Sequence, residues 1–360
     1  TLPDGSDVNN YMERLFSIFN TPTDKREKNT PEYLQKFPYV NGGLFKDVVK
    51  VPTFTTKSRN ILIEVGQLKW SEINPDIFGS MIQAVVTSDH RGNMGMHYTS
   101  VPNIMKVIEP LFLDELYLEF EKAYENKSKL QMLLNRLAKI KIFDPACGSG
   151  NFLIIAYKKL RQLEMSIMQR IDSLSKEKTF QFSEIKLTQF YGIELDDFAH
   201  EVAMLSLWLA EHQMNLEFYK AFGRTSPSLP LQNGGNIVHG NATRVNWEEV
   251  CPKNESDEIY ILGNPPYQGS RKQNKEQKED LAFVFDGFKK FKDLDYIACW
   301  FYIGAKYIQN INAKLALVST NSICQGEQVD MIWPFIFELK VEISFAYQSF
   351  KWKNNAIKFV

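Results

Sequence analysis

The chain has 360 residues, of which 44% are hydrophobic and 24% charged, and its formal net charge is −1 at pH 7. This length allows one large domain together with a smaller one, and the composition is that of an ordinary globular protein. A net charge so close to zero excludes a molecule-wide basic field, so any binding of nucleic acid must depend on local patches.

The cysteines and the apolar runs exclude further classes of protein. The most apolar stretch, residues 296–308, is too short to span a membrane, so we expect no membrane partner. Because the sequence begins with Thr1 and ends in an apolar run, we expect it to be part of a longer polypeptide. Four cysteines are spread along the chain without a Cys-x-x-Cys pair: Cys147, Cys251, Cys299 and Cys324. They indicate neither a disulfide framework nor a zinc site, and favour a reducing cytoplasm.

The first 90 residues predict a small helical domain. Residues 1–40 are polar, with one amphipathic helix expected around residues 10–19. Paired glycines, Gly42 and Gly43, permit a tight turn. A second helix is expected over residues 74–86, with Asn74 as its cap and a proline at its first position.

Residues 91–350 predict a different architecture. Amphipathic helices are expected over residues 102–120 and 127–137, and strands then begin to alternate with helices. This alternation is typical of a mostly parallel α/β sheet. Strands are expected at residues 140–143, 189–193, 237–238, 259–262 and 315–319. Helices are expected at residues 152–164, 197–210, 281–291 and 296–308, with a polar, charged loop at 270–280.

A glycine-rich turn follows the first strand. Residues 144–150 read Asp-Pro-Ala-Cys-Gly-Ser-Gly, and Gly148 and Gly150 permit sharp backbone angles and close approach of a ligand. Leu153 occupies the place of the third glycine of the dinucleotide fingerprint, which argues against a pyrophosphate ligand. A turn that serves only helix–strand packing is the alternative interpretation.

Glu194 ends the second strand, where it could accept hydrogen bonds from ribose hydroxyls at the carboxyl edge of the sheet. A solvated carboxylate at a strand end is an equally good interpretation of this residue alone. Combined with the glycine turn, Glu194 suggests a nucleoside ligand.

The tetrapeptide Asn264-Pro265-Pro266-Tyr267 follows the strand at residues 259–262. Its two prolines fix two φ angles and remove two backbone donors, and they hold the preceding asparagine in an extended conformation. These four residues in order occur by chance in on the order of one in a thousand chains of this length. The asparagine oxygen and a neighbouring carbonyl could accept both hydrogens of an exocyclic amino group, while the tyrosine stacks on its ring. A rigid loop with a buried tyrosine is the plainer alternative.

Together these motifs resemble the S-adenosylmethionine-dependent DNA methyltransferases that methylate amino groups. The order of the motifs resembles the gamma group, whose upstream Tyr-Thr-Pro motif corresponds here to Tyr98-Thr99-Ser100. Further stretches resemble the single-chain type IIG and IIL restriction–modification enzymes: residues 41–45, 318–322 and 345–352. The resemblance covers about residues 40–355. It implies a bacterial cytoplasmic enzyme that acts on double-stranded DNA.

This resemblance implies a fold, a set of domains and a cofactor, S-adenosylmethionine. The fold is a Rossmann-like class I methyltransferase with a mixed, mostly parallel seven-stranded sheet, over residues 91–350. Residues 1–90 correspond to a helical spacer, and residues 351–360 begin a target-recognition region. A nuclease and a recognition domain of the same longer chain are expected partners. The implied cofactor contacts are Tyr98, Thr99, Asp144, Pro145, Ala146, Gly148, Gly150, Glu194, Asn241 and Ala242.

The implied reaction is methylation of adenine N6, with residues 264–267 as the catalytic turn and Phe350 as a second aromatic contact for the base. One departure concerns Asn241, where the family commonly has an aspartate on the cofactor's adenine amino group; an asparagine oxygen accepts without charge. Cytosine N4 methylation and protein glutamine methylation remain alternatives, since both use a similar clamp. An asparagine at position 264 favours adenine over cytosine.

Overall fold

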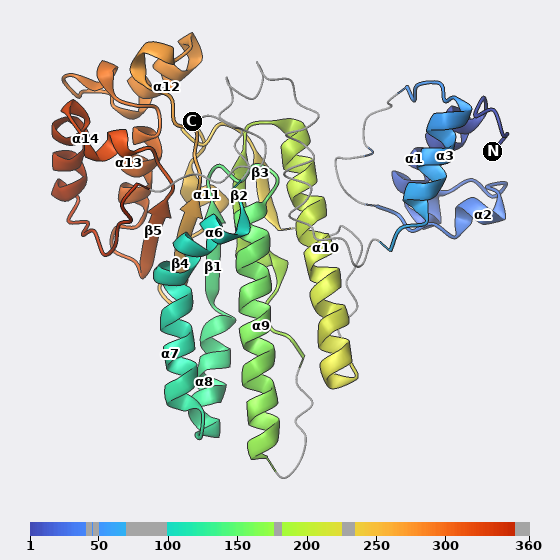
Figure 1. Ribbon diagram of the computed structural model, residues 1–360, viewed down its shortest axis with the longest axis horizontal. Helices are drawn as coiled ribbons and strands as arrows, with labels where there is room; N and C mark the ends of the chain where they lie inside the picture. Colours follow the sequence, from blue (N-terminus) through green and yellow to red (C-terminus); the bar gives the residue numbers. More distant parts are fainter. Residues whose placement is uncertain (41–44, 46–49, 70–98, 176–181, 225–234, 350–360) are drawn as a thin grey trace.

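The computed structural model describes residues 1–360 except for 41–44, 46–49, 70–98, 176–181, 225–234 and 350–360, drawn as a thin grey trace in Figure 1. Several sequence predictions lie outside the described residues. They are the helix over residues 74–86, the paired glycines, the candidate contacts Tyr98 and Phe350, and the region 351–360.

The N-terminal segment is helical, and the helix expected around residues 10–19 is confirmed. Phe16 and Phe19 of this helix both contact the ring of Phe45, with centroids 5.2 and 4.9 Å apart. The Arg26 guanidinium donates a hydrogen bond to the carbonyl of Phe37, at 2.8 Å. The elements are α1 (Val8–Phe19), the 3-10 turn η1 (Thr23–Lys25), α2 (Glu32–Gln35) and α3 (Thr56–Gly66).

Two helical stretches precede the sheet, and both match the sequence prediction. The first is nearly continuous and contains a π-type turn around Pro110. A wider turn of this kind accommodates the proline ring and its missing N–H, which would break a regular α-helix. The elements are α6 (Val101–Ile108), η4 (Glu109–Leu113), α7 (Asp114–Ala123) and α8 (Lys127–Leu137).

The sheet has the order β3-β2-β1-β4-β5, and every pair is parallel. The chain runs outward from β1 to β3 and then returns to the other side of β1 with β4. A crevice therefore forms outside the carboxyl ends of β1 and β4, where ligands of open α/β sheets bind. The strands are β1 (Ile140–Asp144), β2 (Phe190–Glu194), β3 (Asn236–His239), β4 (Glu258–Gly263) and β5 (Ala313–Leu317).

The expected parallel α/β architecture is confirmed, with one difference in strand number. The described residues contain five strands, all parallel, where the resemblance implied seven in a mixed sheet. Residues 341–349, which follow the last described helix, form no strand.

Helices cover both faces of this sheet (Figure 1). The two long helices, α9 and α10, run well beyond the ranges predicted for them. Their apolar positions stay buried as far as Ile171 in α9 and Phe218 in α10, so packing stabilises the extra turns. The elements are α9 (Asn151–Leu174), η5 (Leu187–Gln189), α10 (Asp197–Phe222), α11 (Trp247–Val250), α13 (Ala298–Tyr307), η8 (Asn321–Cys324) and α14 (Glu327–Glu338).

Residues 270–280 differ from the prediction of a polar loop followed by a helix at 281–291. They form the 3-10 turn η6 (Ser270–Lys272) and the start of α12 (Lys275–Val284), and η7 (Phe291–Asp293) follows. The Asn274 side chain accepts a hydrogen bond from the Gln277 N–H, and the Gln277 side chain accepts one from the Asn274 N–H. This capping box begins the helix six residues earlier than its apolar positions suggested.

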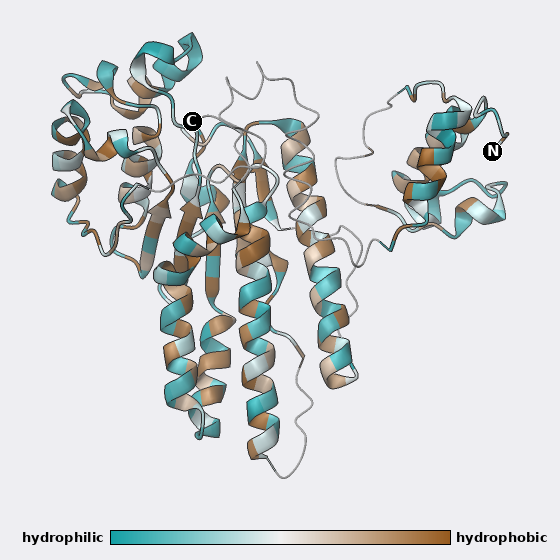
Figure 2. Ribbon diagram, in the orientation of Figure 1, coloured by the Kyte–Doolittle hydropathy of each residue, from teal (hydrophilic) through white to brown (hydrophobic). Residues whose placement is uncertain are grey.

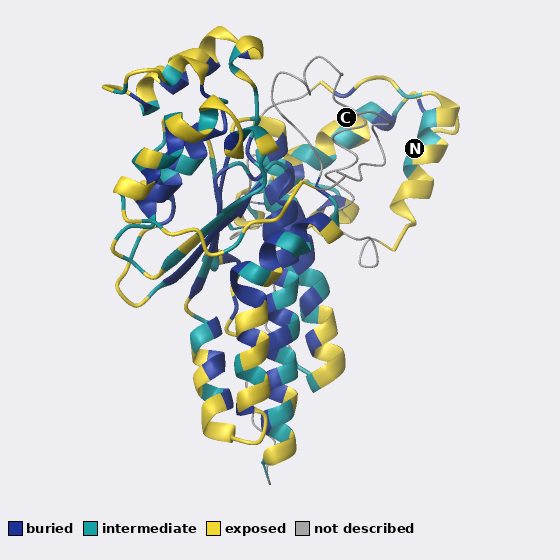
Figure 3. Ribbon diagram, turned by 60° about the vertical axis from the view of Figure 1, so that its left-hand side comes forward, coloured by how far each residue is buried: buried dark blue, intermediate teal, exposed yellow. Residues whose placement is uncertain are grey.

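Successive residues of the central strands serve two hydrophobic clusters, one on each face. Ile142 and Tyr260 pack with α6–α10, while Phe143 and Ile261 pack with α11–α14. Because side chains alternate along a strand, a sheet covered on both faces needs apolar residues at nearly every position. Figure 2 shows the strands as mostly hydrophobic, and Figure 3 shows the central strands as mostly buried, between helices whose outer faces are exposed. No helix of the described residues is long and apolar enough to cross a membrane.

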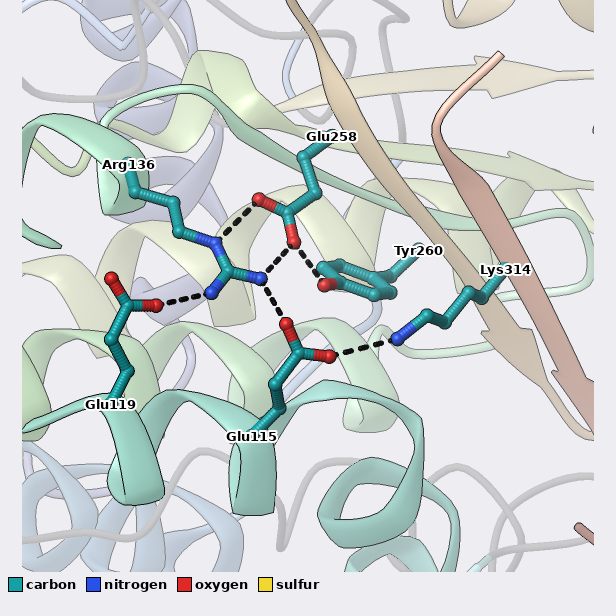
Figure 4. Close-up of polar contacts among 6 residues, drawn as sticks. All are labelled: Glu115, Glu119, Arg136, Glu258, Tyr260 and Lys314. Carbon is teal, nitrogen blue, oxygen red and sulfur yellow. Dashed lines mark hydrogen bonds and ion pairs between the residues drawn. The ribbon is translucent and has the colours of Figure 1, made fainter. Parts of the chain in front are cut away.

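An ion-pair cluster closes the amino edge of the sheet (Figure 4). Arg136 of α8 donates to both carboxylate oxygens of Glu258, which begins β4, at 2.9 and 2.6 Å. It also donates to Glu115 at 2.6 Å and to Glu119, both on α7. Lys314 of β5 donates to the second oxygen of Glu115 at 2.9 Å. The cluster, which we call the Arg136 cluster, thus connects two helices and two strands.

Candidate active site

The carboxyl edge of the sheet brings the glycine turn and the Asn-Pro-Pro-Tyr turn together. Asp144 ends β1, and Gly263 ends the neighbouring strand β4. A Cβ atom added to Gly263 would lie 2.5 Å from Asp144 Oδ1, far inside a normal contact. Only glycine therefore fits between Asp144 and the start of the proline turn.

Gly148 and Gly150 adopt left-handed backbone angles, with φ of 54° and 83°. Gly150 is the N-cap of α9, and a Cβ there would touch Ala203 at 3.4 Å. At Gly148 a Cβ would meet nothing within 4 Å, so this part of the turn faces open space. Both glycines have the conformational role that the sequence predicted.

Glu194 connects the end of β2 to this turn. Its Oε2 accepts a hydrogen bond from the Gly148 N–H at 2.7 Å, and its Oε1 accepts one from the Asp196 N–H at 2.9 Å. Burial raises the pKa of Glu194. Each oxygen keeps a further lone pair. The carboxylate therefore shapes the turn and can still accept from a ligand.

Asp144 is almost completely buried, at 1% exposure. Its Oδ1 accepts a hydrogen bond from the Ala146 N–H at 3.0 Å, while its Oδ2 has no partner among the described residues. Burial, reinforced by the charge of Glu194, raises the pKa of Asp144 to about 8. An unpartnered buried carboxylate oxygen is costly, and a bound donor or cation would relieve that cost.

The residues that lead into the glycine turn contact three neighbouring parts of the fold: α13, the cluster on the α11–α14 face, and β2. The carbonyl of Pro145 accepts a hydrogen bond from the Trp300 indole of α13, at 3.1 Å. Ala146 packs against the cluster on that face. The thiol of Cys147 lies against Gly192 of β2, where an added Cβ would be 2.9 Å from Sγ.

Asn264 contacts the upstream motif. Its Nδ2 donates to the hydroxyl of Thr99 at 3.2 Å, across 165 positions of sequence. Its Oδ1 is buried and has no partner among the described residues. Pro265 is buried, whereas Pro266 and Tyr267 are partly exposed, and Tyr267 packs against the cluster on the α11–α14 face. Thr99, Asn264 and the Asp144 turn thus meet at one edge of the sheet.

Asn241 follows β3 and belongs to a polar network that the sequence did not reveal. Its Oδ1 accepts hydrogen bonds from both the N–H and the hydroxyl of Thr243, at 2.9 and 2.8 Å. Its Nδ2 donates to Asp280 Oδ2 at 2.9 Å. Asp280 also accepts from Arg244 and Tyr296, both at 2.7 Å. Ala242 is buried beside this network, and its carbonyl accepts from the Trp247 indole at 2.8 Å.

The sequence predicts a charged surface loop around Asp280, whereas the structure places this residue in the Asn241 network. It is 5% exposed, and it lies on α12 with its carboxylate turned toward Asn241. The capping pair Asn274 and Gln277 was the available signal, since it places Asp280 on a helix rather than in a loop.

The described residues include one cluster with metal-ligand geometry, Asp197, His200 and Glu201 on α10. His200 Nε2 lies 3.2 Å from the Ile237 carbonyl oxygen. Asp197 is exposed, and acidic groups on an exposed helix end are common without a bound ion.

Comparison with known proteins identifies the family of the chain. Residues 120–359 match the family described as the MmeI DNA-methyltransferase domain, and residues 1–45 match the MmeI helicase spacer domain. The chain is 54% identical over 359 residues to DNA methyltransferase A of Bacillus subtilis (strain 168), covering 99% of this chain and 40% of that protein. A putative type II restriction enzyme and methyltransferase of Methanocaldococcus jannaschii is 35% identical over 250 residues, covering 56% of this chain and 21% of that protein.

A solved structure extends the comparison to three dimensions. The structure of the type IIL restriction–modification enzyme MmeI in complex with DNA matches with a TM-score of 0.87 and 43% identity. The match covers 99% of this chain and 48% of that one. The chain thus spans less than half the length of these relatives. Both the long match to the domain family and the shared fold show that the chain belongs to the family of the MmeI DNA-methyltransferase domain.

Proposed function

We propose that the chain transfers a methyl group from S-adenosylmethionine to the N6 amino group of an adenine extruded from double-stranded DNA. One observation supports an amino group as the acceptor of the methyl group. Asn264 Oδ1 is a buried hydrogen-bond acceptor without a partner in the described part of the chain, beside the glycine turn. A buried acceptor of this kind is satisfied by an incoming N–H donor.

The residues at the carboxyl edge suit S-adenosylmethionine, which supplies a methyl group activated by its sulfonium. Asp144 Oδ2 offers an unpartnered carboxylate oxygen for a cationic or donor group. The open side of the Gly148 turn leaves room beside it, and Glu194 can accept from ribose hydroxyls. Thr99 adjoins Asn264, and Tyr98 precedes it in the chain. Pro145, Ala146, Gly150, Asn241 and Ala242 complete the cofactor contacts in this proposal.

The proline turn aligns the target amino group. Its nitrogen lone pair is delocalised into the base, so it is a poor nucleophile until its geometry changes. Hydrogen bonds from the amino group to Asn264 Oδ1 and the Pro265 carbonyl favour a localised lone pair and hold it in line for displacement. Tyr267 stacks on the extruded ring, and Phe350 is the second aromatic contact. No covalent enzyme intermediate is required, because the thioether displaced from the sulfonium is a good leaving group. The methylated nitrogen is then cationic and releases one proton to water.

The choice of DNA and of a larger assembly rests on the relatives. The MmeI structure contains DNA, and the Methanocaldococcus jannaschii relative is described as a restriction enzyme and methyltransferase. The match of residues 1–45 to a helicase spacer domain supports the proposal that residues 1–90 are a spacer, ahead of a methyltransferase domain at 91–350. A nuclease and a target-recognition region, beginning at 351–360, would belong to the same longer chain.

The test is transfer of tritiated methyl groups by the full-length protein to unmethylated duplex DNA, followed by nucleoside analysis. Label in N6-methyladenine is the expected result. Label in N4-methylcytosine, or in protein glutamine, would overturn the proposal in favour of the corresponding alternative. Asn264→Ala should lower the rate of transfer by about a thousandfold while affinity for S-adenosylhomocysteine stays near normal. Asn135→Ala, an exposed position on α8, is the matched control and should leave both unchanged.

A further inference from the structure

The orientation of the Asn241 amide is determined by its neighbours. A backbone N–H can only donate, so the atom that accepts from the Thr243 N–H must be the amide oxygen. An ionised carboxylate can only accept, so the atom beside Asp280 must be the amide nitrogen. The two contacts lie on opposite sides of the amide and exclude the flipped assignment.

This orientation limits what Asn241 can offer a ligand. Its oxygen already accepts two hydrogen bonds, from the Thr243 N–H and hydroxyl, which uses both of its lone pairs. Its nitrogen donates one hydrogen to Asp280 and keeps the other. Toward a ligand, the side chain of Asn241 is therefore a hydrogen-bond donor and not an acceptor.

Asp280 is an ionised partner in this arrangement. Burial acts to raise its pKa, but hydrogen bonds from Asn241, Tyr296 and Arg244 outweigh burial and hold the pKa below its ordinary value. An aspartate at position 241 would place a second carboxylate about 3 Å from the first. Two such charges cannot both be ionised at low cost. The negative charge that the resemblance placed at position 241 is instead found at position 280.

We propose that Asp280 is a positioning residue for the cofactor: it holds the Asn241 amide so that its free N–H donates to a ring nitrogen of the cofactor's adenine, and the 6-amino group is not read by Asn241. This inference rests on the proposed use of S-adenosylmethionine. It predicts that Asn241 acts together with Asp280 as a hydrogen-bond donor to the cofactor. Asn241 is then not an uncharged, weaker acceptor standing in for an aspartate.

The first experiment exchanges the charges in the full-length protein and measures affinity for S-adenosylhomocysteine by calorimetry. Asn241→Asp is expected to weaken binding by about 10- to 100-fold, because the ring nitrogen loses its donor and faces a carboxylate oxygen instead. Asp280→Asn is expected to weaken it less, because an uncharged partner remains. The double variant Asn241→Asp/Asp280→Asn restores a donor–carboxylate pair within the network, but it leaves no N–H at position 241, so the affinity is not expected to recover. Recovery of the affinity in this variant would overturn the inference.

A pH series separates positioning from a purely structural role. In Asn241→Asp the two carboxylates share a proton more readily at low pH, so its affinity relative to wild type is expected to improve between pH 8 and pH 6. Loss of folding alone would not produce this recovery. If Asn241→Asp does not fold, Asn241→Ala and Asp280→Asn carry the test through the ligand comparison below.

The second experiment compares S-adenosylhomocysteine with its analogue that carries hydrogen in place of the 6-amino group. If Asn241 does not read the amino group, Asn241→Ala weakens both ligands by the same factor. A loss confined to the ligand with the amino group would overturn the inference, as would tighter binding of S-adenosylhomocysteine by Asn241→Asp. Failure of the wild-type protein to bind S-adenosylhomocysteine would overturn the cofactor proposal itself. Normal binding without transfer to adenine would overturn only the proposed reaction.

Discussion

The two edges of the sheet differ in whether their carboxyl groups are paired with cations. At the amino edge, Glu258, Glu115 and Glu119 all contact Arg136, and hydrogen bonds from Arg136 and Lys314 hold the pKa of Glu115 below its ordinary value. At the carboxyl edge, Asp144 and Glu194 form no ion pair with another described residue, and burial raises the pKa of both. The same sheet thus has one edge where the carboxylates are ion-paired, which stabilises the fold, and one edge with uncompensated acceptors, which is suited to a ligand.

The largest effect is expected at the carboxyl edge, from Asn264→Ala. Removing the acceptor for the target amino group should lower the rate of methyl transfer by about a thousandfold, or about 4 kcal/mol in the barrier. The free energy of unfolding should fall by about 1 kcal/mol, because the variant loses one hydrogen bond, from Nδ2 to Thr99, while Oδ1 has no partner to lose in the described structure. Single-turnover kinetics and urea unfolding measure the two quantities. A large loss of stability without a loss of rate would contradict the proposed division between the edges.

Arg136→Met at the amino edge is expected to lower stability and leave the rate of transfer unchanged. Three carboxylates lose their shared cation, so we expect the free energy of unfolding to fall by about 3 kcal/mol. The rate of transfer by the folded protein should be unchanged, since the cluster lies at the opposite edge from the site. Lys314→Met, which removes a more exposed ion pair, is the matched control and should cost less than about 1 kcal/mol. Urea unfolding followed by circular dichroism checks both values.

The buried carboxyl of Asp144 makes the stability of the protein depend on pH through the carboxyl edge of the sheet. Its carboxyl has a raised pKa in the folded state, about 8 against an ordinary value of 3.8. Between these values the folded protein retains a proton that the unfolded chain releases, so this group's contribution to stability falls as pH rises through the window. The slope is at most about 1.4 kcal/mol per pH unit.

The variant Asp144→Asn should remove this part of the pH dependence and make the protein free of ligand relatively more stable near pH 8. Its affinity for S-adenosylhomocysteine should fall, since the carboxylate is lost. Thermal unfolding of both proteins from pH 5 to pH 9 measures the difference. Parallel stability curves for the two proteins would show that Asp144 does not titrate as described.

The smallest effect is expected from Gly148→Ala. No atom lies within 4 Å of the added Cβ, so the cost comes from the left-handed backbone angle alone, about 1 kcal/mol. The variant should still fold, while the methyl group narrows the open side of the turn and weakens S-adenosylhomocysteine binding. Equal losses of stability and affinity at Gly223→Ala, a left-handed glycine at the end of α10, would show that the effect is not specific to the site.

Much of the fold can be predicted from the local pattern of hydrophobic, capping and turn residues. The edge of the sheet that holds the candidate site can be predicted in the same way. The helix over residues 127–137 and the strand at residue 140 were predictable, because hydrophobic period and capping depend on near neighbours in the chain. The ends of parallel strands meet at one edge of a sheet, so placing Asp144, Glu194 and Asn264 after strands was enough to predict that they lie at the same edge. The early start of α12 was missed, although Asn274 and Gln277 carried a local signal for it.

The helical start, the parallel α/β region and the residue types at each strand end follow from sequence alone, since backbone angles and side-chain period are properties of short segments. Tertiary structure alone decided three features: the contact between Thr99 and Asn264, the close approach of Gly263 to Asp144, and the pairing of Asn241 with Asp280. Each joins segments brought together only by the order of the strands and the packing of α12. The charge state of a buried carboxylate depends in the same way on what surrounds it in space, which no short stretch of sequence contains.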